Sequence, residues 1–404
     1  MRVLHLNTND IKGGAAIAAY RLHKGLSKTG IDSKMLVQKK HSDDPTVITP
    51  DFKLKKGWDL LKSEINKFPL RIFNTNQGGP WSINWLPTNI IKKIDKINPD
   101  IVHLHWIGNG FISIKEIGKI KKPIIWTMHD MWPFTGGFHL SNHYVNNDGS
   151  WISKQILKQK IKYWGNLNLT VVSPSTWLAN QAKQSKLFKN KVIKVIPNCL
   201  DTQVFKPIST KIARNILNLP LGKKIILFGA MGINKDKNKG FDLLAEALMH
   251  FSKQIKDHEN YLFTIFGGSR PKNSPIFKIK TKYLGRINDD TKLALIYSAA
   301  DVFIIPSRQE NLPNIIMEAM ACTTPCVGFN IGGIPDMIDH KKNGYLAKPY
   351  YTKDLAKGIQ WIIENRERNK RLGKNARKKA LKNYNQKNQA KKYKRLYQKL
   401  LSGK

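Results

Sequence analysis

Two glutamates eight positions apart are the residues whose spacing best suits chemistry. Glu310 and Glu318 lie in the stretch 307–327, SRQENLPNIIMEAMACTTPCV. Pro313 suits the first turn of a helix, because its missing N–H costs nothing there. Apolar residues then recur at helical spacing until Pro325. We therefore expect Glu310 in the loop before a helix, and Glu318 in the second turn, pointing back toward the helix start.

The start of that helix, near Asn314 and Ile315, also offers a seat for an anion. Its first N–H groups have no partner within the helix, and they carry the positive end of the helix dipole. Two carboxylates that accept hydrogen bonds from sugar hydroxyls, beside a phosphate seat, suit a nucleotide-sugar. Two solvated glutamates without a function are the alternative. The apolar run 301–307 favours the first interpretation, because ligands of open α/β sheets bind outside the carboxyl ends of such buried strands.

The rest of the chain alternates between strand patterns and helix patterns, which predicts an α/β fold. Gly13 and Gly14 follow the first strand pattern and open a helix rich in alanine, a second geometry suited to anions. The expected strands lie within 1–7, 33–38, 99–106, 123–130, 171–181, 192–201, 223–232, 261–268, 281–289 and 301–307, and in the run PCVGFN.

In this order of parts the chain resembles the retaining glycosyltransferases of the GT-B type, specifically glycosyltransferase family 4. The signature is a glutamate, seven residues and a second glutamate in a strand–loop–helix, followed by a Gly-Gly turn; here these are Glu310, Glu318 and Gly332-Gly333. The resemblance implies two Rossmann-like domains that face each other across a cleft. Residues 1–205 would form the acceptor domain and 206–383 the nucleotide-sugar domain, and the final helix, 384–404, would return to the first domain.

The resemblance also implies roles for the catalytic residues and for the contacts to the donor sugar. His129 would contact the donor sugar from the first domain, Glu310 would orient that sugar, and Glu318 would grip the ribose. The backbone around Arg286 and Ile287 would hold the base.

For the diphosphate, the resemblance implies Lys239, the helix start near Asn314 and Ile315, and the loop at Gly13-Gly14. The chain departs from the family pattern where Ala230 and Met231 replace an arginine that binds phosphate. Either Lys235 or Lys237 would substitute for it, or the diphosphate would be held less rigidly. Cys199 and Thr323 stand where the family has glycine.

The chain lacks an Asp-x-Asp motif, and its three cysteines form neither a disulfide framework nor a zinc signature. We therefore expect no metal and no cofactor, with the nucleotide-sugar as substrate. A lipid-linked or saccharide acceptor in cell-surface polysaccharide or lipopolysaccharide synthesis is the expected partner. The alternatives are a GT-B phosphorylase or nucleotide-sugar epimerase, a non-catalytic surface protein and a basic nucleic-acid-binding protein, which would explain the charge but not the glutamate pair.

The net charge of +41 is the strongest signal of the composition. It points to an anionic partner such as a membrane surface, nucleic acid or a phosphorylated substrate, although codon bias toward lysine would give the same charge. Motifs of nucleic-acid-binding modules are missing, so we expect no nucleic acid. Without a signal-peptide pattern or an apolar run of ~20 residues, the expected location is cytoplasmic, at the inner face of the membrane.

Two segments are candidates for contact with an anionic membrane. The segment 52–86 mixes lysines with Trp58 and Phe68, which suits either an interfacial helix or a helix packed on its own domain with solvated lysines. The basic final segment carries Tyr384, Tyr393 and Tyr397, which could serve the same surface.

Overall fold

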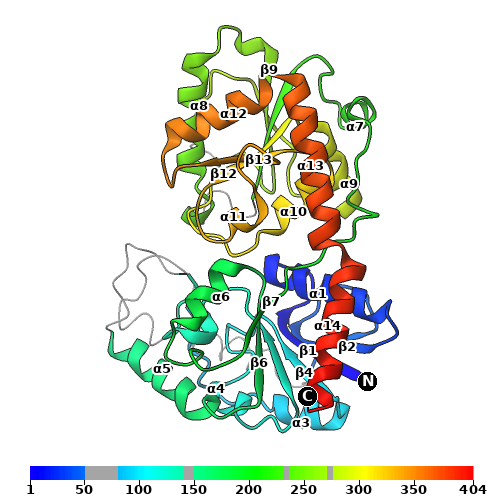
Figure 1. Ribbon diagram of the computed structural model, residues 1–404, viewed down its shortest axis with the longest axis vertical. Helices are drawn as coiled ribbons and strands as arrows, with labels where there is room; N and C mark the ends of the chain where they lie inside the picture. Colours follow the sequence, from blue (N-terminus) through cyan, green and yellow to red (C-terminus); the bar gives the residue numbers. More distant parts are fainter. Residues whose placement is uncertain (51–80, 141–149, 231–235, 271–275, 404) are drawn as a thin grey trace. The chain divides into compact units, whose positions relative to one another are not determined.

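The computed structural model describes residues 1–50, 81–140, 150–230, 236–270 and 276–403. It divides into two compact units, an N-terminal unit of Met1–Cys199 with Gln386–Lys404 and a C-terminal unit of Leu200–Asn385 (Figure 1). Each unit is a parallel sheet with helices on its faces. The predicted pair of Rossmann-like α/β domains is therefore confirmed.

Seven parallel strands form the N-terminal sheet within the described residues, in the order β3-β2-β1-β4-β5-β6-β7. The strands are β1 (Arg2–Asn9), β2 (Asp32–Lys39), β3 (Val47–Ile48), β4 (Ile101–Leu104), β5 (Ile124–Thr127), β6 (Leu169–Ser173) and β7 (Ile193–Val195). The helices are α1 (Gly14–Ser27), α3 (Ile90–Ile97), α4 (Ile114–Ile117), α5 (Trp151–Trp164), α6 (Thr176–Lys183) and α14 (Gln386–Leu401).

Side chains of the central strands alternate between the two faces of this sheet, as the pleat requires. One face packs into the apolar core under α3, α4, α5 and α6 with Leu4, Leu6, Val102, Leu104, Ile124 and Trp126. The opposite face packs against α1 and α14 with Val3, Ile101, Ile125 and Val172. The same alternation places His5, His103 and Thr127 on the α1/α14 face, where each is buried. Both faces are thus covered, as is usual for parallel sheets.

The last helix, α14, lies against α1 of the N-terminal unit, and the chain breaks its helical course at Asn385 before it. Gly25 permits this contact, because a Cβ there would lie 2.7 Å from Cγ of Gln386. The interpretation of the final tyrosines as a membrane face is wrong. Tyr384, Tyr393 and Tyr397 are all buried, and the last two donate to or accept from buried polar groups of the sheet.

The C-terminal sheet has six parallel strands among the described residues, in the order β10-β9-β8-β11-β12-β13. The strands are β8 (Lys224–Gly229), β9 (Tyr261–Phe266), β10 (Thr281–Tyr283), β11 (Val302–Ile305), β12 (Cys326–Phe329) and β13 (Gly344–Ala347). The helices are α7 (Thr210–Ile216), α8 (Phe241–Gln254), α9 (Asp290–Ala299), α10 (Asn314–Ala321), α11 (Ile334–Met337), α12 (Thr352–Ile363) and α13 (Arg366–Tyr384). Asp289 caps α9 by accepting a hydrogen bond from the N–H of Lys292 at 2.6 Å.

The strand orders locate one crevice in each sheet. In the C-terminal unit the chain moves outward from β8 through β9 to β10, then returns to β11 on the other side of β8. In the N-terminal unit it moves from β1 through β2 to β3, then returns to β4 beside β1. Neighbouring loops diverge where the order reverses in this way, and ligands of open α/β sheets bind there, outside the carboxyl ends of the strands.

Thr323, where the resembled family has glycine, adopts a left-handed backbone with φ of 63°. This conformation costs a β-branched residue about 1–2 kcal/mol, whereas glycine adopts it without that cost but loses about 0.5–1 kcal/mol of chain entropy. We therefore expect Thr323→Gly to raise the free energy of unfolding by about 0.5–1 kcal/mol in urea denaturation. The hydroxyl of the neighbouring Thr324 donates a hydrogen bond to Tyr297 O at 2.6 Å. Thr324→Gly removes this bond and should therefore lower the free energy of unfolding. A Thr323→Gly protein no more stable than the parent contradicts this assignment of strain.

The candidate membrane segment 52–86 falls largely outside the described residues, as do both of its aromatic anchors, Trp58 and Phe68. Among the described helices none combines the length and the apolar character needed to cross a bilayer.

Candidate functional site

The loops that follow β8 and β11 bring Lys239 and Glu310 together at the crevice of the C-terminal sheet. Nζ of Lys239 lies 2.9 Å from Oε1 of Glu310, and both side chains are mostly buried, 27% and 14% exposed. The charge of Glu310 raises the pKa of Lys239, although burial opposes the shift. Lys239 is therefore a cation held at the point where the strand order predicts a ligand.

Backbone hydrogen bonds fix the Glu310 loop from several sides. The N–H of Arg308 donates to Asn238 O at 2.8 Å, and the Asn238 side chain donates to Gln309 O at 2.8 Å. On the far side, the N–H of Gly333 donates to Glu310 O at 2.9 Å. Both loops of the crevice are thus tied to each other, which orients the Lys239–Glu310 pair before any ligand binds.

Two glycines with left-handed backbones make these close contacts possible. A Cβ on Gly332 would lie 2.2 Å from Glu310 O, and a Cβ on Gly240 would lie 2.0 Å from Pro306 O. Their φ angles are 52° and 64°. The Gly-Gly turn of the sequence motif therefore has a physical role, because it lets the chain after β12 support the Glu310 loop.

We expect Gly332→Ala to destabilise the C-terminal unit by about 1–3 kcal/mol and to displace Glu310, because the methyl group would meet a backbone oxygen in a strained conformation. Thermal unfolding measures the first effect, and activity measures the second. Gly222→Ala is the matched control, since a Cβ at Gly222 meets no atom within 4 Å. Equal melting temperatures for the two variants would contradict this role of Gly332.

Helix α10 begins where the sequence predicts, with Pro313 in the N-cap position and Asn314 as the first helical residue. Asn314 and Ile315 are both half-buried at its start. Glu318, one turn later, is only 4% exposed and accepts a hydrogen bond from the Tyr297 hydroxyl at 3.0 Å. The structure thus gives the two glutamates different partners, with Lys239 on Glu310 and Tyr297 on Glu318.

A second cation beside this pair is Arg308, which sequence reasoning missed. Its guanidinium forms two bonds to the Asp242 carboxylate, with 2.8 Å from Nη1 to Oδ1 and 2.5 Å from Nη2 to Oδ2. Nη1 also donates to Lys237 O at 2.7 Å, so Arg308 ties its own loop to α8 and to the Lys239 loop. The Lys237 residue is exposed, and Lys235, the other predicted substitute, lies outside the described residues.

The segment predicted to hold the base follows β10. Arg286 is exposed and its Nε donates to Asn288 Oδ1 at 3.2 Å, whereas Ile287 is half-buried. The preceding Gly285 accepts a backbone bond from Gly267 at 2.8 Å, which joins this segment to the loop after β9.

In the N-terminal unit, Gly13 and Gly14 lie at the start of α1, directly after β1 and at the crevice of that sheet. Gly13 has a φ of 101°, and a Cβ on either glycine would meet no atom within 4 Å. The buried Asp10 holds the preceding loop in place by accepting backbone bonds from His41 and Ser42. The predicted glycine loop is therefore an open turn on a fixed base.

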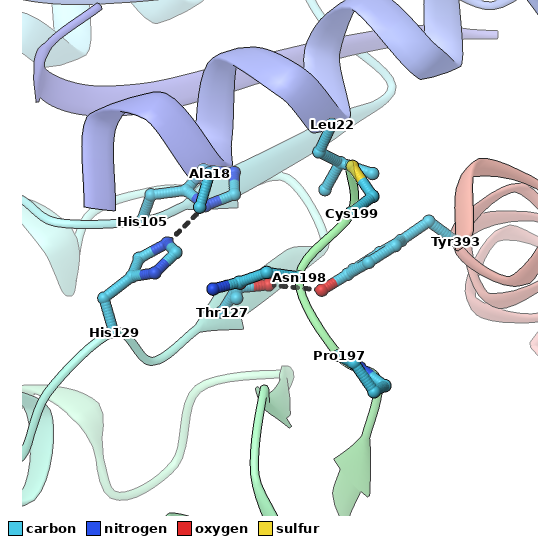
Figure 2. Close-up of a pocket in the computed structure, with 9 residues that line it drawn as sticks. All are labelled: Ala18, Leu22, His105, Thr127, His129, Pro197, Asn198, Cys199 and Tyr393. Carbon is cyan, nitrogen blue, oxygen red and sulfur yellow. Dashed lines mark hydrogen bonds between the residues drawn. The ribbon is translucent and has the colours of Figure 1, made fainter. Parts of the chain in front are cut away.

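His129 follows β5 and is half-buried at the edge of the sheet. It lines a small cavity of about 10 Å³ with His105, Thr127, Asn198 and Cys199 among its neighbours (Figure 2). Burial lowers the pKa of His129 to about 4, although the charge of Asp130 opposes the shift. His129 is therefore neutral near pH 7.

The neighbouring Asp130 belongs to a separate, structural group. Its Oδ2 lies 2.6 Å from Nδ1 of His139 and accepts from Trp106 Nε1 at 2.7 Å, and Nε2 of His139 lies 2.8 Å from Ser82 Oγ. Burial favours the neutral acid, but the His139 charge and these donors outweigh it and hold the pKa of Asp130 below its usual value. Ser82 and His139 are 3% and 2% exposed. This Ser–His–Asp arrangement therefore braces a loop and offers no accessible nucleophile.

Sequence reasoning assigned no site role to two further histidines, His5 and His105, which form hydrogen bonds in the group that includes His129. Both occur as polar residues within strands whose other residues are apolar, in VLHLN and IVHLHW. Alternation along a strand predicts which of its side chains are buried, and these histidines fall at such positions. A polar residue at a buried position was the signal that could have identified them.

Comparisons with known proteins agree with this fold. Residues 12–204 match the family described as Glycosyltransferase Family 4, and residues 209–379 match Glycosyl transferases group 1. Sucrose-phosphate synthase from Thermosynechococcus elongatus shares the fold with a TM-score of 0.74 at 20% identity, over 100% of both chains. HepE from Anabaena, solved in complex with UDP and glucose, has a TM-score of 0.65 at 16% identity, over 98% of each chain.

Among curated proteins, the chain is 24% identical to the sulfoquinovosyl transferase SQD2 of Arabidopsis thaliana over 72% of its length. It is 23% identical to a D-inositol 3-phosphate glycosyltransferase of Corynebacterium aurimucosum over 70% of its length. The chain spans 55% of the first relative and 67% of the second. The fold and the matched families place the protein among the GT-B glycosyltransferases, a class of transferases. Each half of the chain thus matches its own model, glycosyltransferase family 4 for residues 12–204 and the group 1 glycosyltransferases for residues 209–379.

Proposed function

We propose that this protein transfers a sugar from a nucleotide-sugar to an acceptor, with retention at the anomeric carbon. The observation that carries the proposal is the Lys239–Glu310 pair, which joins the two loops of the C-terminal crevice beside the start of α10. A cation, a helix start and a carboxylate in one place suit a diphosphate attached to a sugar.

The chemical task is to stabilise a departing diphosphate and an oxocarbenium-like sugar. Lys239 and the N–H groups at the start of α10 supply the positive charge for the diphosphate. When phosphate oxygens replace Glu310 as the partner of Lys239, the Glu310 carboxylate can accept hydrogen bonds from the sugar hydroxyls. His129 is proposed to contact the donor sugar, and the leaving phosphate itself takes the acceptor proton. We propose that this chemistry needs no metal and no cofactor, since lysine takes the place of a divalent cation.

For the donor, a nucleotide-sugar is supported by the solved complexes of HepE, which contain UDP, UDP with glucose, or UDP-glucose. For the acceptor, we propose a lipid-linked or saccharide molecule of cell-surface polysaccharide or lipopolysaccharide synthesis. Another protein of the same fold, WaaG, is described as involved in lipopolysaccharide biosynthesis. The net charge of +41 supports peripheral binding to an anionic membrane at its cytoplasmic face.

Release of nucleoside diphosphate from UDP-, GDP- and ADP-sugars, with and without a bacterial lipid extract as acceptor source, tests the proposal. We expect release from one donor class that depends on the extract and persists in excess EDTA. An epimerase would convert the donor without release, and a phosphorylase would require orthophosphate. Release only in the presence of Mn²⁺ or Mg²⁺ would contradict the metal-independent mechanism, and no release from any donor would contradict the function.

Glu318 should act on donor binding rather than on turnover. A ribose contact is made in the ground state and the transition state alike, so we expect Glu318→Gln to raise the donor KM about tenfold and to leave kcat nearly unchanged. Tyr297→Phe is the companion variant, because it removes only the hydroxyl that bonds to Glu318 Oε2 at 3.0 Å. It should raise KM less. Unchanged donor affinity of Glu318→Gln in calorimetry would make Glu318 a structural residue.

A further inference from the structure

Three imidazole rings of the N-terminal unit form a continuous hydrogen-bonded chain. Nδ1 of His5 lies 3.0 Å from Nε2 of His105, and Nδ1 of His105 lies 3.1 Å from Nε2 of His129. His5 belongs to β1, His105 follows β4, and His129 follows β5. The exposed fraction is 0% for His5 and 3% for His105, whereas His129 is half-buried. This row of hydrogen-bonded imidazoles therefore runs from the interior of the unit to the cavity that His129 lines.

A neutral imidazole donates from one ring nitrogen and accepts with the other. Burial lowers the pKa of all three rings, so all are neutral near pH 7. Each bond of the chain joins two ring nitrogens, which allows only two proton arrangements. Either every ring carries its proton on Nδ1, and the bonds point from His5 toward His129, or every ring carries it on Nε2, and they point inward.

The inner end of the chain distinguishes these two arrangements. Nε2 of His5 is buried and has no hydrogen-bond partner among the described residues. The first arrangement leaves a lone pair at this atom, whereas the second leaves an N–H. Buried N–H groups without an acceptor are rarer than acceptors without a donor. The burial of Nε2 of His5 therefore favours the first arrangement, in which every ring carries its proton on Nδ1 and the bonds point from His5 toward His129.

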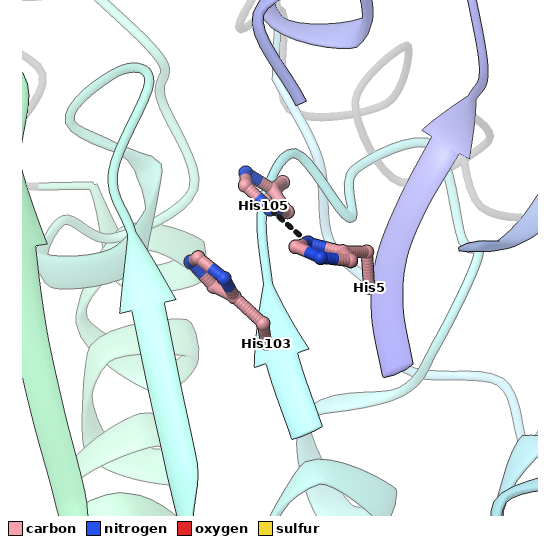
Figure 3. A group of neighbouring side chains, drawn as sticks. All are labelled: His5, His103 and His105. Atoms are coloured by element: carbon pink, nitrogen blue, oxygen red, sulfur yellow. Dashed lines mark hydrogen bonds between the residues drawn. The ribbon is translucent and has the colours of Figure 1, made fainter. Parts of the chain in front are cut away.

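Four histidines crowd together here, and a bound metal is the competing interpretation. Nitrogens of His5, His103 and His105 all lie within 4.8 Å of one another (Figure 3). However, both nitrogens of His103 already have partners, the Tyr397 hydroxyl at 2.7 Å and Thr127 Oγ1 at 2.8 Å. A metal would have to break one of these bonds, whereas the imidazole chain keeps all of them.

We propose that His5 and His105 are positioning residues that hold His129 in the Nδ1–H tautomer. His129 can then offer Nδ1 only as a hydrogen-bond donor, and it is not a general base, because the lone pair of Nε2 is engaged by His105. This inference rests on the proposed function only for the group that would accept this hydrogen bond. The tautomer itself is a property of the protein without substrate.

Two-bond ¹H–¹⁵N spectra of the full-length protein, labelled with [¹⁵N]histidine, test the proposal at neutral pH. We expect a protonated Nδ1 and an unprotonated Nε2 for His129. Removal of the middle ring in His105→Leu should shift His129 to the averaged signals of a ring that exchanges between tautomers. His103→Leu is the matched control, because His103 is equally buried and contacts the same rings but is not bonded to His129. It should leave the tautomer of His129 unchanged.

A protonated Nε2 or averaged signals for His129 in the parent protein would overturn the proposal. So would an unchanged His129 tautomer in a folded His105→Leu protein. If that variant does not fold, the parent spectrum alone decides. Because no sugar donor is present, the result is independent of whether glycosyl transfer is found.

Discussion

Glu310→Ala should lower kcat by at least ~10²-fold with the fold intact, comparable with the loss of one preorganised polar contact to the transition state. Glu310 sits 2.9 Å from Lys239 on a loop held by Asn238 and Gly333, so its carboxylate is positioned before the donor binds. Steady-state kinetics with the active donor measure the effect. Glu310→Gln keeps the shape of the side chain and removes only its charge, so it separates loss of the ion pair from loss of packing.

A matched control is Glu259→Ala in the same unit. Glu259 also pairs with a lysine, with 3.0 Å to Lys223 Nζ, but its side chain is 85% exposed and it precedes β9, whereas the crevice loops follow β8 and β11. This variant should retain the activity of the parent. Full activity in a folded Glu310→Ala protein would remove Glu310 from the mechanism.

The second large effect concerns acid stability of the N-terminal unit. Burial lowers the pKa of five histidines there, to about 4 for His23 and His129 and well below the usual value for His5, His103 and His105. Below the unfolded-state pKa of about 6.5, the unfolded chain takes up protons that these rings in the folded state do not. The contribution of these neutral rings to the free energy of unfolding is therefore fully present above pH 6.5 and decreases as the pH falls toward 4. Each histidine contributes up to about 1.4 kcal/mol per pH unit.

Hydrogen exchange between pH 7 and pH 5, corrected for intrinsic rates, follows each sheet separately. We expect peptides of β1 and β4 to lose protection steeply, and those of β8 and β11 to change little. In the C-terminal unit only His340 has a clearly lowered pKa among the described histidines. Equal protection of β1 at the two pH values would show that the buried histidines do not control stability.

The fold of the central strands could be predicted from the sequence, because parallel strands covered on both faces are nearly continuous apolar runs. The start of α10 followed from Pro313 and the apolar spacing after it. These are local signals. Short edge strands such as β3, with two residues, carry no such pattern, so the sequence did not reveal them.

The partners of the site residues could not be predicted, because they depend on contacts between distant segments. The motif indicated Glu310 and Lys239 separately, but their bond joins residues 71 positions apart. Arg308 was overlooked because its role depends on reaching Asp242 across the same crevice. His5 and His105 meet only when β1 and β4 pair, 100 positions apart in sequence. In each case the residue types were visible and the juxtaposition was not.

The most direct test of the central claim, that the crevice with Lys239 binds the donor diphosphate, is calorimetric titration with UDP, GDP and ADP. We expect one of the three to bind the parent protein and Lys239→Met to weaken that binding about 10- to 100-fold, through loss of a charge-assisted contact. Lys223→Met removes an equal charge from the pair with Glu259, whose carboxylate is 85% exposed, and this variant should bind like the parent. Equal affinity of Lys239→Met and the parent for the same nucleotide would contradict the claim, as would the failure of all three nucleotides to bind.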